Sequence, residues 1–154
     1  IGMGGLKYYL LKVDPKKRMM FNPEESIELN GNTGPFLQYA HARIQSLLTK
    51  AGDIGSFENA VLGNEEKEVI KLINQYPAVI KEAGDNYSPA VLANYLFELV
   101  KVYNHFYQVV PVLIEKYHET QLYKNHLMNH NTYPLQVVFQ LYNQMVYPFF
   151  ALKV

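Results

Sequence analysis

The sequence has no cysteine among its 154 residues, and this absence excludes two kinds of protein. A disulfide framework needs paired cysteines, and the commonest structural zinc sites are built from cysteine thiolates. Several catalytic motifs are missing as well: the phosphate loops GxxxxGKS and GxxxxGKT, the dinucleotide glycine fingerprint, GxSxG and HExxH. We therefore do not expect catalysis within these residues.

The apolar runs of the sequence are short. None approaches the roughly 18 to 20 residues that a helix needs to cross a bilayer, and the amino end has no basic-then-apolar segment of the signal-peptide kind. We expect a soluble, cytoplasmic monomer that does not contact a membrane. Because the chain begins at Ile1, without methionine and inside a helical pattern, we also expect that residues precede it in a longer protein.

Charge is balanced overall but unevenly distributed. Fourteen basic and fourteen acidic residues cancel, so a phosphate-binding surface would have to be local. Residues 1–50 carry seven basic and four acidic groups, residues 51–100 three and eight, and residues 101–154 four and two. Two mildly basic ends around an acidic middle permit a phosphate-facing surface built from distant segments.

Apolar residues recur at helical spacing through most of the chain, which predicts an all-α helical bundle. We expect helices over residues 3–13, 34–50, 64–75, 77–84 and 89–110. Residues 16–35 are expected to form a small irregular excursion or a hairpin. The pattern from Pro134 onward fits a helix, although residues 136–142 also fit a strand. The stripes predicted to face the core are Leu6, Tyr9, Leu10 and Val13; Leu37, Ile44, Leu47 and Leu48; and Leu92, Leu96, Leu99, Tyr103, Phe106 and Val110.

The candidate binding residues are aromatic or basic. Phe36, Tyr39 and Arg43 are spaced i, i+3, i+7 and share one strip of a predicted helix. Tyr39 and Tyr107 have flat faces suited to stacking on unpaired bases, but tyrosines at helical spacing more often line the edge of a core. The loop residues 16–18, Lys-Lys-Arg, form the densest basic cluster and either meet phosphates or stay solvated.

Two weaker patterns each have a functional and an ordinary interpretation. Gly31 and Gly34 precede a helix, where free amides can bind an anion, but two glycines more often form an ordinary turn. His126 and His130 lie at i, i+4 spacing, which suits a metal ion, but two histidines without a carboxylate partner are too few ligands. We therefore expect no metal site.

Two stretches of the sequence resemble one family closely. Residues 31–46, GNTGPFLQYAHARIQS, lie within a longer stretch, residues 3–48, that resembles the junction between the catalytic and anticodon-binding domains of arginyl-tRNA synthetases. Residues 88–113, SPAVLANYLFELVKVYNHFYQVVPVL, resemble the central helix of the DALR-type anticodon-binding domain of the same family. Together the stretches cover roughly three-quarters of the chain.

This resemblance implies a class I arginine–tRNA ligase, which uses ATP with magnesium, and a helical C-terminal domain that docks on the anticodon side of its tRNA. Residues 1–35 would end the catalytic part, and residues 36–154 would form the anticodon-binding domain. The HIGH and KMSKS-type motifs are absent from these residues. The chain alone is thus expected to hold no cofactor and not to activate arginine, and its implied partners are arginine tRNA and an N-terminal catalytic domain.

The resemblance also implies roles for single residues. Phe36, Tyr39 and Tyr107 would face the anticodon loop, while Arg43, Asn104 and the loop of Lys16, Lys17 and Arg18 would contact phosphates or polar groups. The tail from about residue 117 does not match the family, so it has either diverged or is an out-of-frame reading. The alternative function is a helical protein-interaction module without RNA binding, in which neutral charge and exposed aromatics serve a protein partner.

Overall fold

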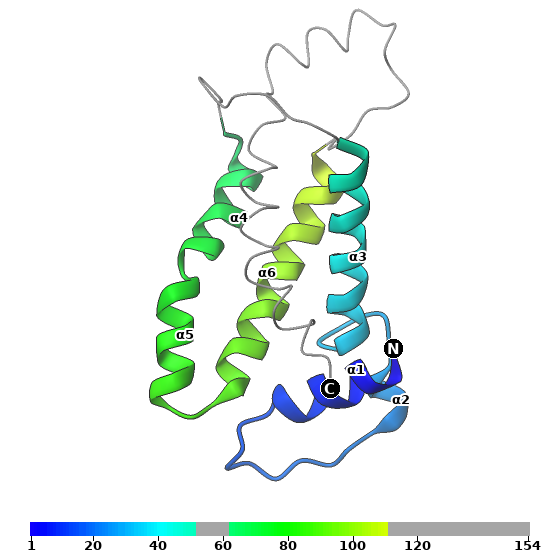
Figure 1. Ribbon diagram of the computed structural model, residues 1–154, viewed down its shortest axis with the longest axis vertical. Coiled ribbons are helices and arrows are strands. Elements are labelled where there is room, and N and C mark those ends of the chain that lie inside the picture. The colour runs from blue at the N-terminus through cyan, green and yellow to red at the C-terminus, as the bar shows by residue number, and fades with distance from the viewer. Residues whose placement is uncertain (52–61, 111–154) are drawn as a thin grey trace, which may run out of the picture. The chain divides into compact units, whose positions relative to one another are not determined.

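The computed structural model describes residues 1–51 and 62–110, and every regular element in those ranges is a helix (Figure 1). The helices are α1 (Gly2–Leu11), α2 (Pro23–Ser26), α3 (Gly34–Ala51), α4 (Asn64–Asn74), α5 (Tyr76–Asp85) and α6 (Pro89–Val109). The predicted all-α class is confirmed, and five predicted helices end within two residues of the observed bounds. Within the described ranges, no helix has the length and apolarity that crossing a membrane requires. The pattern from Pro134 and the atypical tail lie outside the described residues.

The chain divides into two compact units. Unit 1 contains residues 1–43 and 74–101, and unit 2 contains residues 44–73 and 102–154. The division falls inside α3 and inside α6, so each of these helices contributes one segment to each unit.

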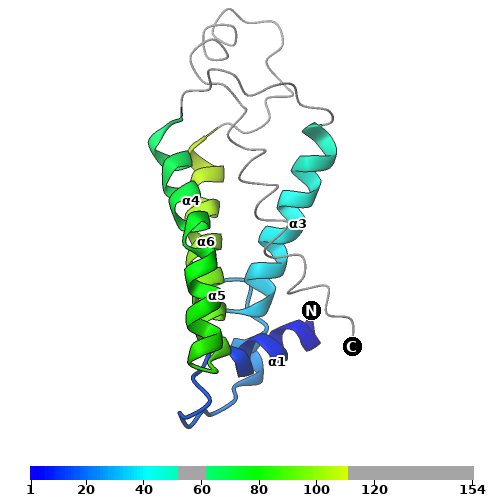
Figure 2. The ribbon, with the colours of Figure 1, turned by 60° about the vertical axis from the view of Figure 1, so that its left-hand side comes forward.

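In unit 1, α1 lies crosswise against the beginning of α3 (Figures 1 and 2). The approach is close because glycines supply the contact. A Cβ atom on Gly34 would come within 2.5 Å of the Gly4 carbonyl oxygen, and one on Gly5 within 2.6 Å of the Ser26 carbonyl oxygen. Main chain therefore packs directly on main chain at these points, and only glycine fits there.

The excursion between α1 and α3 is irregular and contains the short helix α2. Asn22 caps this helix, since its Oδ1 accepts the Glu24 amide at 3.1 Å. Residues 18–21 form no strand, so the hairpin alternative is not observed; the Asn-Pro pair at 22–23 starts a helix instead. The Tyr9 hydroxyl donates to the Met20 carbonyl at 2.9 Å and ties the loop to α1.

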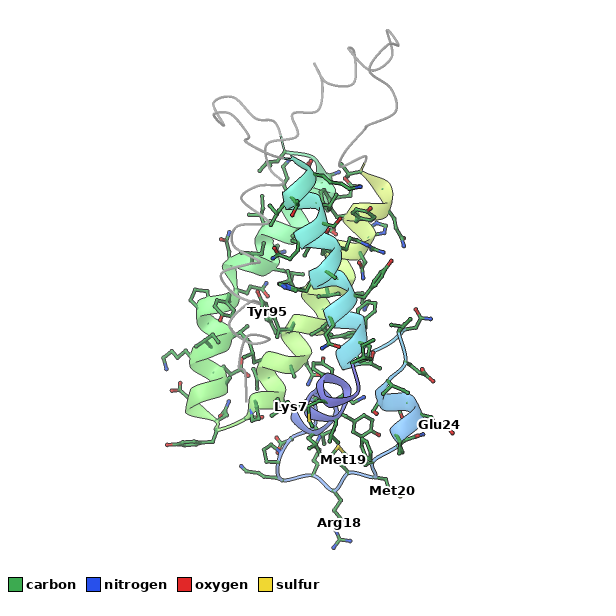
Figure 3. The ribbon with its side chains drawn as sticks, turned by 45° about the vertical axis from the view of Figure 1, so that its right-hand side comes forward. Lys7, Arg18, Met19, Met20, Glu24 and Tyr95 are labelled. Atoms are coloured by element: carbon green, nitrogen blue, oxygen red, sulfur yellow. The ribbon has the colours of Figure 1, made fainter. Side chains whose placement is uncertain are left out.

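Also in unit 1, α5 and the beginning of α6 form an antiparallel hairpin. The turn is a Schellman motif: Ser88 N–H donates to Ala83 O at 3.0 Å, and Tyr87, at φ 49°, occupies the left-handed position that favours glycine. The rings of Tyr76 and Tyr95 lie 6.1 Å apart, and Tyr95 projects from α6 toward α5 (Figure 3). Burial, assisted by Tyr76, raises the pKa of Tyr95 well above its usual range.

Each unit has its own set of buried apolar residues. The set in unit 1 is Tyr8, Tyr9, Leu37, Ala40, Ala90, Ala93, Tyr95, Leu96, Leu99 and Val100. The set described in unit 2 is Ile44, Leu47, Val69, Ile73, Tyr103 and Phe106. The α6 stripe is thus confirmed in its middle, whereas Leu92 and Val110 are half-buried. The α1 stripe was partly wrong, because Leu10 is exposed and Tyr8 is buried in its place.

Candidate nucleic-acid interface

The beginning of α3 is fixed by a side-chain cap. Thr33 Oγ1 accepts the Phe36 amide at 3.3 Å, and its hydroxyl donates to the Glu28 carbonyl at 2.6 Å. From this start the helix buries Leu37 and Ala40 completely. The neighbouring strip of the helix, which begins at Phe36, is consequently held in a defined orientation.

On that strip Tyr39 and Arg43 form a stacked pair. The Arg43 guanidinium carbon lies 4.7 Å from the centroid of the Tyr39 ring, at the i, i+4 spacing that brings helical neighbours together. Such cation–π contacts contribute about 0.5–1 kcal/mol at exposed sites. Tyr39 remains 56% exposed in spite of this contact. This strip of α3 therefore offers a flat aromatic ring and a cation side by side.

Phe36 extends the strip to α6, where its ring lies 5.7 Å from the ring of Phe97. Lys101 Nζ is 5.9 Å from the Phe97 centroid and 3.2 Å from Glu98 Oε2. That ion pair is exposed and therefore weak, so Lys101 can exchange the carboxylate for another anion. Phe97 and Lys101 were not predicted, although they repeat the i, i+4 aromatic-to-cation spacing of Tyr39 and Arg43.

We name this set the aromatic–cation strip. It consists of Phe36, Tyr39, Arg43, Phe97 and Lys101, all in unit 1. Its rings offer faces on which unpaired bases stack, and its two cations attract phosphates. His41, on the same helix, adds no cation at neutral pH, because burial lowers its pKa below the ordinary value of 6.5.

Two further predicted residues belong to unit 2. Asn104 and Tyr107 are half-buried on α6, and the ring of Tyr107 lies 6.3 Å from that of the buried Tyr103. Tyr107 therefore makes the core-edge contact that the commoner interpretation predicts, and its ring stays partly exposed. The aromatic–cation strip belongs to unit 1, so these two residues are described apart from it.

The predicted basic loop is exposed. Lys16, Lys17 and Arg18 follow Asp14, whose carboxylate accepts the Lys16 amide at 2.8 Å. Arg18 stands at the tip of the loop and points away from the helices, while Met19 lies on the inner side beneath α1 (Figure 3). The three side chains are exposed to solvent.

The structure supports an ordinary turn at Gly31 and Gly34. Gly31 has φ 82°, and the start of α3 is occupied by the Thr33 cap and by the main chain of Gly4. No anion can reach the Gly34 main chain on the side that Gly4 covers. Among the described residues no three histidine, cysteine, aspartate or glutamate side chains gather to hold a metal ion. His126 and His130 lie outside those residues.

Comparison with known proteins assigns the family. The profile of the DALR anticodon binding domain matches residues 37–129, more than half of the chain. The chain belongs to the DALR anticodon binding domain family. The resemblance drawn from residues 31–46 and 88–113 is thereby confirmed.

Relatives of this DALR domain are ligases. The arginine–tRNA ligase of Flavobacterium psychrophilum is 56% identical over 125 residues, which are 80% of this chain and 21% of that protein. The corresponding ligase of Bacteroides fragilis is 45% identical over 130 residues, 80% of this chain and 22% of that protein. The chain therefore spans about a fifth of the length of these curated relatives.

A solved structure has the same fold. The arginyl-tRNA synthetase of Thermus thermophilus matches with a TM-score of 0.71 and 27% sequence identity, covering 94% of this chain and 25% of that one. The helical DALR fold is thus shown by sequence and by structure.

Proposed function

We propose that this chain binds the anticodon side of an arginine tRNA, as part of an arginine–tRNA ligase. The observation that carries the proposal is the aromatic–cation strip of a DALR domain. Each base that stacks on an exposed ring gains about 1–3 kcal/mol. The choice of an arginine tRNA is supported by the arginine–tRNA ligases of two organisms, which are 56% and 45% identical to this chain.

On this proposal Tyr39, with 56% of its surface exposed, is the principal stacking residue. Phe36 and Phe97 offer the edge of a second ring platform, and Arg43 and Lys101 supply the phosphate contacts. Tyr107, Asn104 and the Lys16–Arg18 loop are additional proposed contacts. Tyr107 is half-buried, so its expected contribution is smaller than that of Tyr39.

The chemistry of charging tRNA is proposed to lie outside these residues. The curated relatives are about five times as long as the matched part, so there is room in them for a separate site that uses ATP with magnesium. The chain alone is expected not to attach arginine to tRNA. A cytoplasmic location and a monomeric state stay predictions.

The partner within a longer ligase would meet unit 1 at its α1–α2 apolar surface. We use this name for Met3, Leu10, Met20, Ile27 and Leu29. All five side chains are more than half exposed, and Met20 is 91% exposed. The five come from the segment of residues 3–29, and a contiguous exposed apolar patch marks a protein contact. We propose that the remainder of the ligase covers them.

The function is tested by fluorescence anisotropy of a labelled arginine-tRNA transcript, and of the same transcript with its central anticodon base changed, at several salt concentrations. We expect binding that weakens with salt and with the base change, because phosphates and an unpaired base are both contacted. Tyr39→Ala should weaken binding by about fivefold to a hundredfold.

The control variant is Tyr87→Ala. Tyr87 is an 88% exposed tyrosine of the same unit, ten residues before Phe97 along the chain. Its loss should leave RNA binding unchanged. If both variants bind like the parent chain, Tyr39 is not a contact, and if the parent does not bind, the proposed function is wrong.

The second candidate function, a protein-interaction module, is favoured by the α1–α2 apolar surface alone. Apolar docking has little dependence on salt, whereas phosphate binding weakens linearly on a log–log scale. A partner that binds equally well at low and high salt would favour this second function.

A further inference from the structure

Four side chains of unit 1 form a polar network between α1, the segment before α3, and α6. We name it the polar joint, with members Tyr8, Lys12, Asn32 and Asn94. The Tyr8 hydroxyl lies 2.5 Å from Asn32 Oδ1 and 2.9 Å from the Ala93 carbonyl oxygen, so two acceptors share its single proton. Asn32 Nδ2 in turn donates to Asn94 Oδ1 at 3.2 Å.

Lys12 closes the network through both its main chain and its side chain. Asn94 Nδ2 donates to the Lys12 carbonyl at 3.3 Å and to the Ala90 carbonyl at 2.9 Å. The Lys12 ammonium donates to the Asn32 carbonyl at 3.0 Å and pairs with Glu25 at 3.6 Å. Each member thus binds at least one other member, and three chain segments are held at once.

The polar joint is close along the chain to both rings of the aromatic–cation strip. Asn94 stands three residues before Phe97 on α6, a spacing at which helical residues are neighbours, and Asn32 lies two residues before the start of α3, which carries Phe36 in its first turn. The Tyr8 hydroxyl of α1 donates to the carbonyl oxygen of Ala93 on α6. In an α-helix that carbonyl is also the acceptor for the amide four residues later, which is the amide of Phe97.

We infer that the polar joint is a positioning device for RNA binding, which holds the start of α3 against α6 so that Phe36 and Phe97 meet before RNA arrives. The inference rests on the proposed function. Tyr8 itself is only 2% exposed and touches no RNA. By holding the two rings together in the free protein, the polar joint reduces the conformational entropy that is lost when RNA binds.

A neighbouring residue provides a matched comparison. Tyr9 is also buried on α1, and its hydroxyl also makes one main-chain hydrogen bond, to Met20 at 2.9 Å. That bond reaches the loop and not α6. Tyr8→Phe and Tyr9→Phe therefore remove the same atom from adjacent buried rings, but only the first removes a hydrogen bond from α1 to α6.

The experiment measures RNA affinity of both variants of the 154-residue chain at a temperature far below either melting transition. The probe is the arginine-tRNA transcript. Tyr8→Phe should weaken binding by about threefold to tenfold, and Tyr9→Phe by less than about twofold. The salt dependence should be unchanged in both, because neither variant removes a cation.

A double-mutant cycle shows whether the joint acts through the rings. In a Phe97→Leu background, Tyr8→Phe should cause little further loss of affinity, because the ring pair it positions is already gone. Additive losses would contradict the inference. Without RNA, NMR cross-peaks between the ring protons of Phe36 and Phe97 should weaken in Tyr8→Phe and persist in Tyr9→Phe.

The outcomes separate the two proposals. If the parent chain binds RNA and both tyrosine variants lose affinity equally, or if the ring cross-peaks are equal in both, the positioning role is overturned while the proposed function stands. If the parent chain does not bind RNA, the proposed function fails, and a role of the joint in RNA binding is overturned with it.

Discussion

The aromatic–cation strip and the α1–α2 apolar surface are both exposed parts of unit 1, but they differ in chemistry. In the strip Tyr39 lies against the Arg43 guanidinium and Phe97 lies near the Lys101 ammonium, while the rings of Phe36 and Phe97 meet between α3 and α6. The apolar surface presents flexible aliphatic side chains such as Met20 and Leu29. Rings and cations suit bases and phosphates, whereas aliphatic side chains suit another protein.

The largest expected effect comes from disrupting the close packing of α1 on α3, the helices that contribute to the two surfaces. In Gly34→Ala the new Cβ would lie 2.5 Å from the Gly4 carbonyl oxygen, and neither main chain can yield without separating α1 from α3. We expect a loss of about 1–3 kcal/mol or more in the free energy of unfolding, together with weaker RNA binding. Urea unfolding followed by circular dichroism measures the loss.

Gly84→Ala is the control for that substitution. A Cβ on Gly84 meets nothing within 4 Å, and alanine is the better helix former, so this variant should be as stable as the parent or gain about 0.5–1 kcal/mol. If the two alanine variants unfold alike, the close packing of α1 on α3 is not important for stability.

The next largest effect is a difference in RNA affinity when the same substitution is made at each of the two surfaces. Phe97→Leu replaces a flat ring in the strip, and we expect RNA affinity to fall by about threefold to tenfold with little change in stability. Phe21→Leu makes the same change beside the apolar surface, where the ring of Phe21 packs edge-on against Tyr9 at 5.2 Å. Anisotropy should show unchanged RNA binding for Phe21→Leu, and equal losses would mean that the strip has no special role.

Much of this arrangement could be predicted from the sequence, because helix positions depend on local signals. Pro89 after Ser88 and Pro35 after Gly34 mark helix starts, and the apolar spacing of Leu96 and Leu99 gives the buried face. Tyr39 and Arg43 were predicted together for the same reason, since both lie on one helix.

What could not be predicted depends on how elements cross. Leu10 fits a helical stripe better than Tyr8, but the glycine contacts of α1 turn Tyr8 inward, where its hydroxyl finds partners 24 and 85 residues away. Phe97 belongs to the strip only because Phe36 of another helix lies beside it. The hairpin alternative failed since the Asn22 cap favours a helix over a strand.

A smaller effect is expected from making the apolar surface polar. Met20→Ser with Leu29→Ser removes two side chains that are 91% and 62% exposed, so the free energy of unfolding should change by less than about 0.5 kcal/mol. RNA binding should not change. Association with a separately produced remainder of the ligase should weaken, as measured by sedimentation, and unchanged association would place that contact elsewhere.

The smallest expected effect is a pH dependence that arises on the strip's own helix. Burial lowers the pKa of His41, so protons bind the unfolded chain better than the folded one. The stability that neutral His41 contributes is complete above its unfolded pKa of about 6.5 and is lost as the pH falls below that value. We therefore expect the melting temperature to decrease from pH 6.5 downward.

The effect of added RNA on this pH dependence distinguishes the two surfaces. Phosphates bound at the strip would favour protonated His41 on α3, so added RNA should reduce the acid loss of stability, whereas a protein bound at the apolar surface should not. His41→Gln removes the titrating group and should flatten the profile with or without RNA. A profile that keeps its acid slope in His41→Gln would assign the slope to other groups, and RNA that leaves the parent's slope unchanged would place the phosphates away from this part of α3.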